Sequence, residues 1–216
     1  MGMELKLPTE KLETIGLGAL MHDIGKVSVP KEILMKPGKL KDEEYVIVKE
    51  HALEGFELLR NTHTVPLLVS HCAFQHHERL DGSGYPRGLK GDEIHDYAKI
   101  VTVADVFDAV TSHRVYRQAM LPHEGLEMLY AGSDRHFQGK IVKAFQHSVA
   151  IYPVGITVSL NDGRKGVVVK QNQSLNDRPI VRVLEEDGYP VAPYEINLAE
   201  KLSLVVTDCD TTYKRS

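Results

Sequence analysis

An adjacent imidazole and carboxylate, His22 and Asp23, stand in the run GALMHDIGKVSVP, and Lys26 follows them. An imidazole nitrogen and a carboxylate oxygen are common ligands of divalent metal ions. An ammonium group nearby is a point charge that can hold a phosphate oxygen. The three residues therefore predict a site that binds a metal ion and a phosphate group together.

Three further clusters carry residues of the same types. His51 stands in KEHALEG, the pair His76-His77 leads into the glycine-rich loop DGSGYP, and Asp105 lies inside the apolar run KIVTVADVFDAV. Taken singly, His51 could be a hydrogen-bonded core histidine, the pair could be the polar end of a helix, and Asp105 could pair with a neighbouring helix. Several imidazoles and carboxylates facing one bundle core would pack poorly without a cation. Jointly they predict a metal-dependent phosphodiesterase.

The first two helices should bring three of these side chains inward. A first helix is expected after Pro8, with Thr9 as its N-cap and Gly25 as its stop, which leaves the His22-Asp23 pair at the floor of a bundle. A second helix, from about Asp42 to Leu59, places His51 on an inward apolar stripe.

The next two helices should complete the cavity. A third helix, leading from Val65 toward His77, directs both terminal histidines into the same space. In a fourth helix, roughly Tyr97 to Ser112, apolar residues surround Asp105, and an unpaired carboxylate there would cost several kcal/mol that a bound cation offsets. The remaining histidines that we assign are expected at the surface: His63, His95, His123, His136 and His147.

The apolar pattern changes near Pro153. Before it the apolar residues mostly recur at helical spacing, and after it come short β-branched runs such as GITVSL, GVVVKQ and PIVRVL, separated by turn signals such as Asn161-Asp162-Gly163 and Asp187-Gly188. We therefore expect a mainly α protein: an α-helical bundle over residues 1–152, followed by a small β-barrel or sandwich over residues 153–216. The C-terminal module offers no chemistry, and we expect a packing or regulatory role for it.

Composition excludes several classes of protein. The 216 residues include 26 basic and 30 acidic ones, and the formal net charge of -4 gives no sign of a surface for long nucleic acid. The apolar stretches are shorter than the roughly 18 residues that span a bilayer, and no signal segment begins the chain. Cys72 and Cys209 are expected in a helix and at a strand edge, which argues against a disulfide scaffold. We expect a cytoplasmic protein without a membrane span.

The order HDIGK, KEHALEG, HHERLDGSGYPRGLKGDEI and VADVFDAVTSHRVYR closely resembles the HD-GYP domain, a bacterial subgroup of the HD metal-dependent phosphohydrolases. The match runs from about Leu17 to Phe145. The resemblance implies an all-α HD-type bundle that hydrolyses the second messenger cyclic di-GMP to linear pGpG or onward to GMP. It also implies the metal ligands His22, Asp23, His51, His76, His77 and Asp105.

The same resemblance assigns roles within that set. Two divalent metal ions would share the carboxylate of Asp23, and they can supply a nucleophile at neutral pH while holding the phosphate oxygens. Mixed imidazole and carboxylate ligation suits iron or manganese, with zinc or nickel as other choices. Asp23 and Lys26 are then the catalytic candidates. The positions expected to face the cyclic dinucleotide are Lys26, Tyr85, Arg114 and Arg117.

Departures from the family pattern keep alternatives open. Similar domains carry an upstream histidine ligand on earlier helices, and residues 1–8 contain no histidine. Either the chain is a shortened form of the domain, or the first metal has one ligand fewer and an extra water; we expect weaker binding of that metal in both cases. One alternative is a weak or inactive module that binds cyclic di-GMP, or that binds a diguanylate cyclase domain through the GYP loop. Another is a hydrolase of a different cyclic dinucleotide or nucleotide.

Overall fold

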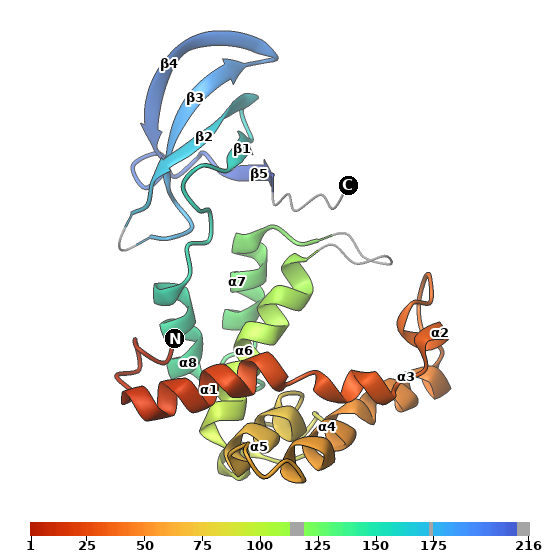
Figure 1. Ribbon diagram of the computed structural model, residues 1–216. Coiled ribbons are helices and arrows are strands. Elements are labelled where there is room, and N and C mark those ends of the chain that lie inside the picture. The colour runs from red at the N-terminus through yellow and green to blue at the C-terminus, as the bar shows by residue number, and fades with distance from the viewer. Residues whose placement is uncertain (113–118, 173–174, 211–216) are drawn as a thin grey trace. The chain divides into compact units, whose positions relative to one another are not determined.

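Ten helical segments and five strands follow one another along the described part of the chain, which comprises residues 1–112, 119–172 and 175–210 of a computed structural model (Figure 1). The helical segments are α1 (Thr9–Met21), η1 (Ile24–Ser28), α2 (Lys31–Leu34), α3 (Asp42–Lys49), α4 (His51–Arg60), α5 (Leu67–Gln75), η2 (Gly91–Glu93), α6 (Asp96–Thr111), α7 (Pro122–Ala131) and α8 (Gly139–Ser148), of which η1 and η2 are 3-10 turns. Two compact units result, Met1–Ala119 with Glu127–Phe145, and Met120–Leu126 with Gln146–Ser216.

The start and the end of α1 correct two expectations. Pro8, and not Thr9, occupies the N-cap, and it makes no side-chain cap bond; Thr9 is the first helical residue. The helix ends at Met21, before Gly25, which lies inside the following 3-10 turn η1. Gly25 allows η1 to approach α4 closely, because a Cβ on it would lie 2.0 Å from the carbonyl oxygen of His51. The 3-10 turn thus packs directly on the start of α4.

The expected single helix from Asp42 to Leu59 is wrong, because two helices, α3 and α4, cover this stretch. Glu50 separates them, with backbone angles still in the helical region. The carbonyl oxygen of Val48 accepts a hydrogen bond from the ring of His51 at 2.6 Å. This side chain therefore satisfies one of the backbone carbonyl groups in the last turn of α3. The break leaves His51 as the first residue of α4, with its ring inside the bundle.

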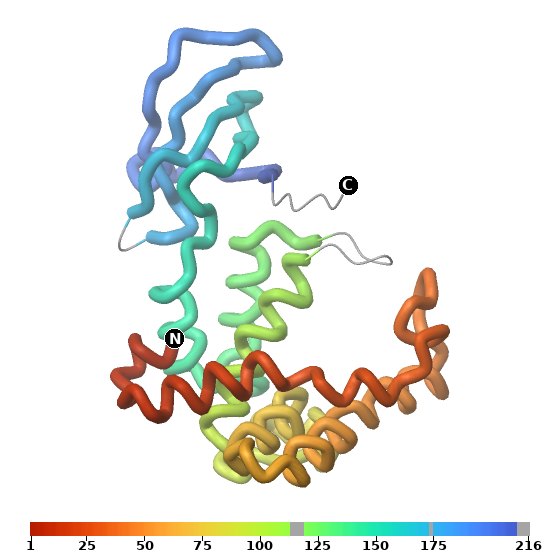
Figure 2. Tube along the Cα trace, viewed as in Figure 1, coloured from red at the N-terminus to blue at the C-terminus, as the bar shows by residue number. Residues whose placement is uncertain are grey.

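Helix α5 packs against α1, α4 and α6, and Figure 2 shows α6 crossing the direction of α1 in the helical unit. Leu59, Val69 and Ala73 form a buried cluster between α4 and α5, and the partly buried Leu17 and Met21 of α1 pack against it. Burying such side chains stabilises each by about 1.5–3 kcal/mol relative to exposure. The packing fixes the ends of α1 and α5, which carry the polar residues of interest.

The second unit contains an antiparallel sheet with the strand order β4-β3-β2-β1-β5. Its strands are β1 (Thr157–Leu160), β2 (Arg164–Lys170), β3 (Ile180–Glu186), β4 (Tyr189–Asn197) and β5 (Val206–Cys209). As expected, Asn161-Asp162-Gly163 turns the chain between β1 and β2, and Asp187-Gly188 turns it between β3 and β4 with both residues at positive φ. The expected fold class, a helical bundle followed by a small β-rich module, is confirmed.

The two cysteines lie where the sequence placed them. Cys72 is buried in α5, Cys209 ends β5, and both are free thiols. Among the described residues no helix has both the length and the apolar character needed to cross a bilayer.

Candidate metal centre

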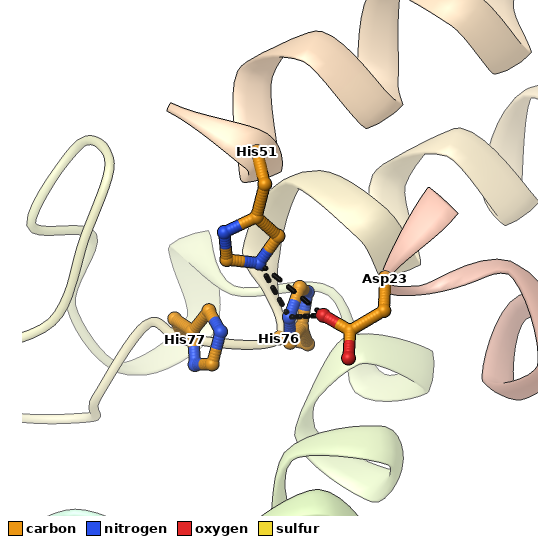
Figure 3. A group of neighbouring side chains, drawn as sticks. All are labelled: Asp23, His51, His76 and His77. Carbon is orange, nitrogen blue, oxygen red and sulfur yellow. Dashed lines mark hydrogen bonds and ion pairs between the residues drawn. The ribbon is translucent and has the colours of Figure 1, made fainter. Parts of the chain in front are cut away.

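The ends of three helices deliver four ligand-type side chains to one point in the helical unit. Asp23 follows α1 and begins η1, His51 begins α4, and His76 and His77 follow α5. One ligand atom from each of the four lies within 4.8 Å of all the others, and Figure 3 shows the side chains converging. His51 and His76 are almost completely buried, at 1% and 0% exposure.

Three atoms of this group form a tight triangle. The Nε2 atoms of His51 and His76 are 3.4 Å apart, and Oδ1 of Asp23 lies 3.4 Å from the first and 3.7 Å from the second. Ligand atoms about 2.1 Å from one tetrahedral ion stand about 3.4 Å from one another. The spacing of the three donors therefore fits a shared metal ion.

Backbone carbonyls fix the tautomers of both rings. Nδ1 of His51 lies 2.6 Å from the carbonyl oxygen of Val48, and Nδ1 of His76 lies 2.8 Å from that of Ala73. A carbonyl oxygen only accepts hydrogen bonds, so each Nδ1 carries the proton and each Nε2 of the neutral ring presents a lone pair. Burial lowers the pKa of His51, and it lowers that of His76 to about 4, so both rings are neutral at pH 7.

The polar atoms of this triangle are unsatisfied without a cation. Two lone pairs face each other at Nε2 of His51 and of His76, and the buried Oδ1 of Asp23 has no hydrogen-bond partner within the described residues. A buried acceptor without a partner costs on the order of 1–3 kcal/mol. A divalent cation would remove these costs at once, so the residues fit a metal ion on chemical grounds.

A second donor group lies on the other side of Asp23. Nε2 of His22 is 3.3 Å from Oδ2 of Asp23 and 3.6 Å from Oδ1 of Asp105, while its Nδ1 lies 2.7 Å from the carbonyl oxygen of Ala19. Each oxygen of Asp23 thus belongs to a different group, as a bridging carboxylate requires. The predicted ligands His22 and Asp105 come together here, next to the four-residue cluster.

The charge state of this second group differs from that of the first. Burial opposes a charged ring, but hydrogen bonds to the carboxylates of Asp105 and Asp23 outweigh it and raise the pKa of His22 to about 10. Burial likewise opposes ionisation of Asp23 and Asp105, yet hydrogen bonds from His22, and from Lys26 in the case of Asp23, hold both pKa values below their usual range. In the metal-free protein His22 therefore carries a proton that a metal ion must displace.

His77 lies between the metal ligands and the glycine-rich loop. Its Nδ1 is 4.0 Å from Oδ2 of Asp105, and its ring stacks on that of Tyr85 with centroids 4.6 Å apart. Burial strongly lowers the pKa of His77, so this ring is also neutral at pH 7. The predicted ligand and the predicted substrate-facing tyrosine are therefore in direct contact.

Lys26 occupies the rim of the centre. Its Nζ donates a hydrogen bond to Oδ2 of Asp23 at 2.5 Å, and the residue also lines a cavity of about 460 Å³ beside the donor groups. The predicted positions Arg114 and Arg117 lie outside the described residues. Of the predicted substrate-facing residues, Lys26 and Tyr85 share this cavity.

The cavity also contains residues that the sequence interpretation missed. Its lining includes Tyr45 and Arg79 together with apolar side chains of α2 and α3. The rings of Tyr45 and Tyr85 meet edge to face with centroids 6.4 Å apart, and Nζ of Lys49 lies over both rings. An aromatic residue six places before a candidate ligand, on the preceding helix, gives no signal by itself. A volume of this size is typical of a small-molecule site.

Glu78 is a third residue that the sequence interpretation left without a role. It is 2% exposed, and its two carboxylate oxygens accept the backbone N–H groups of Arg87 at 2.8 Å and Leu89 at 3.0 Å. These bonds fasten the far side of the glycine-rich loop to the residue after His77. Gly84 completes the turn, because a Cβ there would lie 2.5 Å from the carbonyl oxygen of His77.

The expected surface histidines are only partly as expected. His63 and His147 are exposed. His95 instead caps α6, since its Nδ1 accepts the backbone N–H of Tyr97, and His123 hydrogen-bonds the hydroxyl of the buried Tyr152. His136 is half-buried and pairs with Asp81 at 3.4 Å. The apolar spacing of the sequence did not reveal these polar contacts, two of which join residues far apart in the chain.

Comparison with known proteins places the helical unit. Residues 1–141 match the HD domain, and residues 157–215 match a KOW domain associated with the HD domain. The chain belongs to the HD domain family, and the resemblance to its HD-GYP subgroup is confirmed.

Two named phosphodiesterases and one solved structure are similar to the chain. The chain is 41% identical over 180 residues to the cyclic di-GMP phosphodiesterase PA4108 of Pseudomonas aeruginosa, a match that covers 83% of this chain and 43% of the relative. It is 43% identical over 126 residues to 3'3'-cGAMP-specific phosphodiesterase 1 of Vibrio cholerae, covering 58% and 29%. The solved structure of Bd1817, an HDG"Y"P protein from Bdellovibrio bacteriovorus, shares the fold with a TM-score of 0.55 at 21% identity, covering 66% and 45%. The chain thus spans less than half the length of these relatives.

Proposed function

We propose that the helical unit is a metal-dependent phosphodiesterase that hydrolyses cyclic di-GMP to linear pGpG, and onward to GMP. The observation that carries the proposal is the bridging position of Asp23, whose Oδ1 joins His51 and His76 while its Oδ2 joins His22. Two donor groups that share one carboxylate fit two ions, and the cavity that begins at His51 and His77 gives a substrate access to them.

The donor set supports divalent iron or manganese at both positions, since it combines neutral imidazoles with carboxylates and contains no thiolate. When bound, the two ions supply a nucleophile at neutral pH and offset the charge that develops on the phosphate. His51, His76 and Oδ1 of Asp23 would hold one ion. His22, Asp105 and Oδ2 of Asp23 would hold the other. His77 belongs to the four-residue cluster of the first ion and also lies beside Asp105.

The remaining residues orient the substrate. In the reaction a water oxygen joins the phosphorus atom, the bond from phosphorus to O3′ breaks, and O3′ takes up a proton, which leaves a linear dinucleotide with a 5′-phosphate. Lys26 stands at the cavity wall, where its ammonium group can contact a phosphate oxygen next to Asp23. The rings of Tyr45 and Tyr85 offer apolar faces for a base.

A different cyclic dinucleotide is the second candidate substrate. The relative from Vibrio cholerae that is specific for 3'3'-cGAMP matches the chain at 43% identity, close to the value for the cyclic di-GMP enzyme. The candidate metal ligands act on the phosphodiester group and not on the bases, so they do not determine which base the substrate carries. We therefore propose cyclic dinucleotides as the substrate class, with cyclic di-GMP first among them.

Turnover of the metal-loaded protein tests the proposal. We expect anaerobic protein reconstituted with iron or manganese to convert cyclic di-GMP to pGpG, with 3'3'-cGAMP tested in parallel. Asp23→Asn and His76→Gln should each lower turnover by at least about a hundredfold, whereas Asp92→Asn, at an exposed aspartate, should leave it within twofold. Lack of product from both dinucleotides with both metals would overturn the proposal.

Contact with a diguanylate cyclase domain through the loop Asp81–Pro86 stays a prediction. Ser83 and Pro86 of this loop are exposed, so a protein surface can reach them. Co-sedimentation with a purified diguanylate cyclase domain, compared between the parent chain and Ser83→Arg, measures it. Equal sedimentation of both chains would count against the loop as the contact.

A further inference from the structure

Arg79 is a cation of the cavity that forms no ion pair with a carboxylate among the described residues. Its guanidinium lies 5.1 Å from the ring centre of Phe137, the residue lines the same cavity as Lys26 and Tyr85, and its Nη1 is buried without a hydrogen-bond partner in the described part of the chain. The aromatic face holds the guanidinium in place but accepts no N–H from Nη1. Arg79 thus has a fixed position, and its Nη1 has no hydrogen-bond acceptor among the described residues.

The two carboxylates that act on the charge of this guanidinium, Asp81 and Asp105, are themselves paired with other cations. Asp81 pairs with Arg135 and His136. Asp105 pairs with His22 and lies beside His77. Within the described residues, the positive charge of Arg79 is therefore available to a ligand in the cavity.

A phosphate group is the anion that fits such a donor. A guanidinium presents several N–H groups in a planar fork, which matches two oxygens of a phosphate, and a buried charge gains more from such a pair than an exposed one. Lys26, the other cation of the lining, already donates to Asp23 at the edge of the metal centre. The two cations therefore serve different parts of the cavity.

A cyclic dinucleotide carries two phosphodiester groups, and only one of them can occupy the metal centre at a time. We propose that Arg79 binds the second, uncleaved phosphate of the ring. The inference rests on the proposed function for the identity of the ligand. It makes Arg79 a residue that selects cyclic dinucleotides over ligands with a single phosphodiester.

Equilibrium binding of two hydrolysis-resistant probes tests this role. The first probe is the bis-phosphorothioate analogue of cyclic di-GMP, and the second is the phosphorothioate of linear GpG, which has the same two guanosines and a single phosphorus atom. Both are titrated calorimetrically into the manganese-loaded full chain. The variant Arg79→Met removes the charge and keeps an apolar stem against Phe137. Arg87→Met is the matched control, since it removes one charge from an exposed position of the same loop that does not line the cavity.

We expect Arg79→Met to weaken binding of the cyclic probe by about tenfold to a hundredfold, the change for losing a hydrogen bond between charged groups, and that of GpG by less than about twofold. Arg87→Met should leave both within about twofold. If Arg79→Met unfolds the chain, Arg79→Lys replaces it, with a smaller loss that is still confined to the cyclic probe because a point charge replaces the fork.

Other results overturn the inference. Unchanged binding of the cyclic probe would show that Arg79 only packs on Phe137. Equal weakening of both probes would show that Arg79 acts through the metal centre or the fold. Absence of binding of the cyclic probe by the parent chain would show that the cavity does not bind cyclic dinucleotides. Turnover of cyclic di-GMP by the parent chain is measured separately. Its absence overturns the proposed function, while the two binding ratios still decide on Arg79.

Discussion

The Nε2 atoms of His51 and His76 face each other across 3.4 Å, with the proton of each ring held on the far side by a backbone carbonyl. The metal-free protein thus already presents two lone pairs to one point. By contrast, His22 is held as a cation by Asp23 and Asp105. The two halves of the centre therefore differ in how many protons they lose on binding a metal ion.

Metal binding at pH 8 should release one proton from His22, in addition to a proton lost by a metal-bound water. The pKa of His22, raised to about 10, keeps the ring charged until a metal ion displaces the proton, whereas His51 and His76 are already neutral. Calorimetric titration in buffers of different protonation enthalpy counts the protons. His22→Gln should lower the count by about one and the exposed His63→Gln should leave it unchanged; an equal count for His22→Gln and the parent chain would contradict the assignment.

The stability of the metal-free protein should fall as the pH is lowered from 7 to 5. The pKa of His76 is about 4 in the folded chain and 6.5 in the unfolded chain, so below pH 6.5 the unfolded chain binds more protons. The contribution of His76 is therefore fully present above pH 6.5 and is lost toward pH 4, with about 2 kcal/mol gone by pH 5. His22 does not cancel this loss, because its raised pKa gives a contribution that is constant below pH 6.5 and is lost only toward pH 10.

Thermal unfolding in the presence of a chelator measures this slope. His76→Gln removes the titrating ring and should show a smaller fall between pH 7 and 5 than the parent chain. His63→Gln, at an exposed position, should keep the parent slope. A parallel slope for His76→Gln would mean that His76 does not titrate in this range.

Gly25→Ala should damage the centre although Gly25 binds nothing. A Cβ at this position would lie 2.0 Å from the carbonyl oxygen of His51 and 2.4 Å from the backbone nitrogen of Gly55, so η1 and α4 must separate. We expect a loss of at least about 2 kcal/mol in the free energy of unfolding and weaker metal binding, since Asp23 and His51 move apart.

Gly16→Ala is the matched control for Gly25→Ala. Gly16 lies inside α1, and a Cβ there meets nothing within 4 Å. Alanine should stabilise the helix by about 0.5–1 kcal/mol and leave metal affinity unchanged. Chemical denaturation and a metal titration of both variants decide the matter; similar effects of the two substitutions would exclude the close contact as the cause.

Glu78→Gln should loosen the glycine-rich loop. The amide that replaces one carboxylate oxygen would face the N–H of Arg87 or Leu89, donor against donor, in a buried site. We expect a loss of about 1–3 kcal/mol in stability and faster proteolysis within residues 79–90, with Tyr85 no longer held on His77. Glu93→Gln, whose exposed carboxylate caps Lys90, is the comparison; equal proteolysis of both variants would contradict the role of Glu78.

Sequence spacing predicted the inward direction of His51, because helical periodicity and apolar neighbours determine it. That His22 and Asp105 belong to one ligand set was implied by the family resemblance. Sequence spacing did not predict the break at Glu50, since the apolar pattern continues without interruption from α3 into α4. The role of Gly25 was also mistaken. A glycine after a helix reads as a stop, but here it permits contact with a segment that lies far along the chain.

The contributions of Glu78 and Arg79 were out of reach for a similar reason. Both stand beside the conspicuous pair His76-His77, and charged residues at a helix end are usually solvated. Only the folded course of residues 79–90 places backbone N–H groups around Glu78 and a cavity beside Arg79. Their functions depend on the backbone N–H groups and the cavity that the loop places beside them. These contacts cannot be predicted from the residues next to them in sequence.

The end of α5 assigns separate tasks to consecutive residues. His76 directs a lone pair toward Asp23, His77 stacks on Tyr85, and Glu78 fastens the loop. All three residues lie just after Gln75, the last residue of α5, so one residue inserted or deleted there would misdirect the side chains that follow it. A change in the register of this short segment would therefore disturb a candidate ligand, an aromatic contact and a loop anchor together.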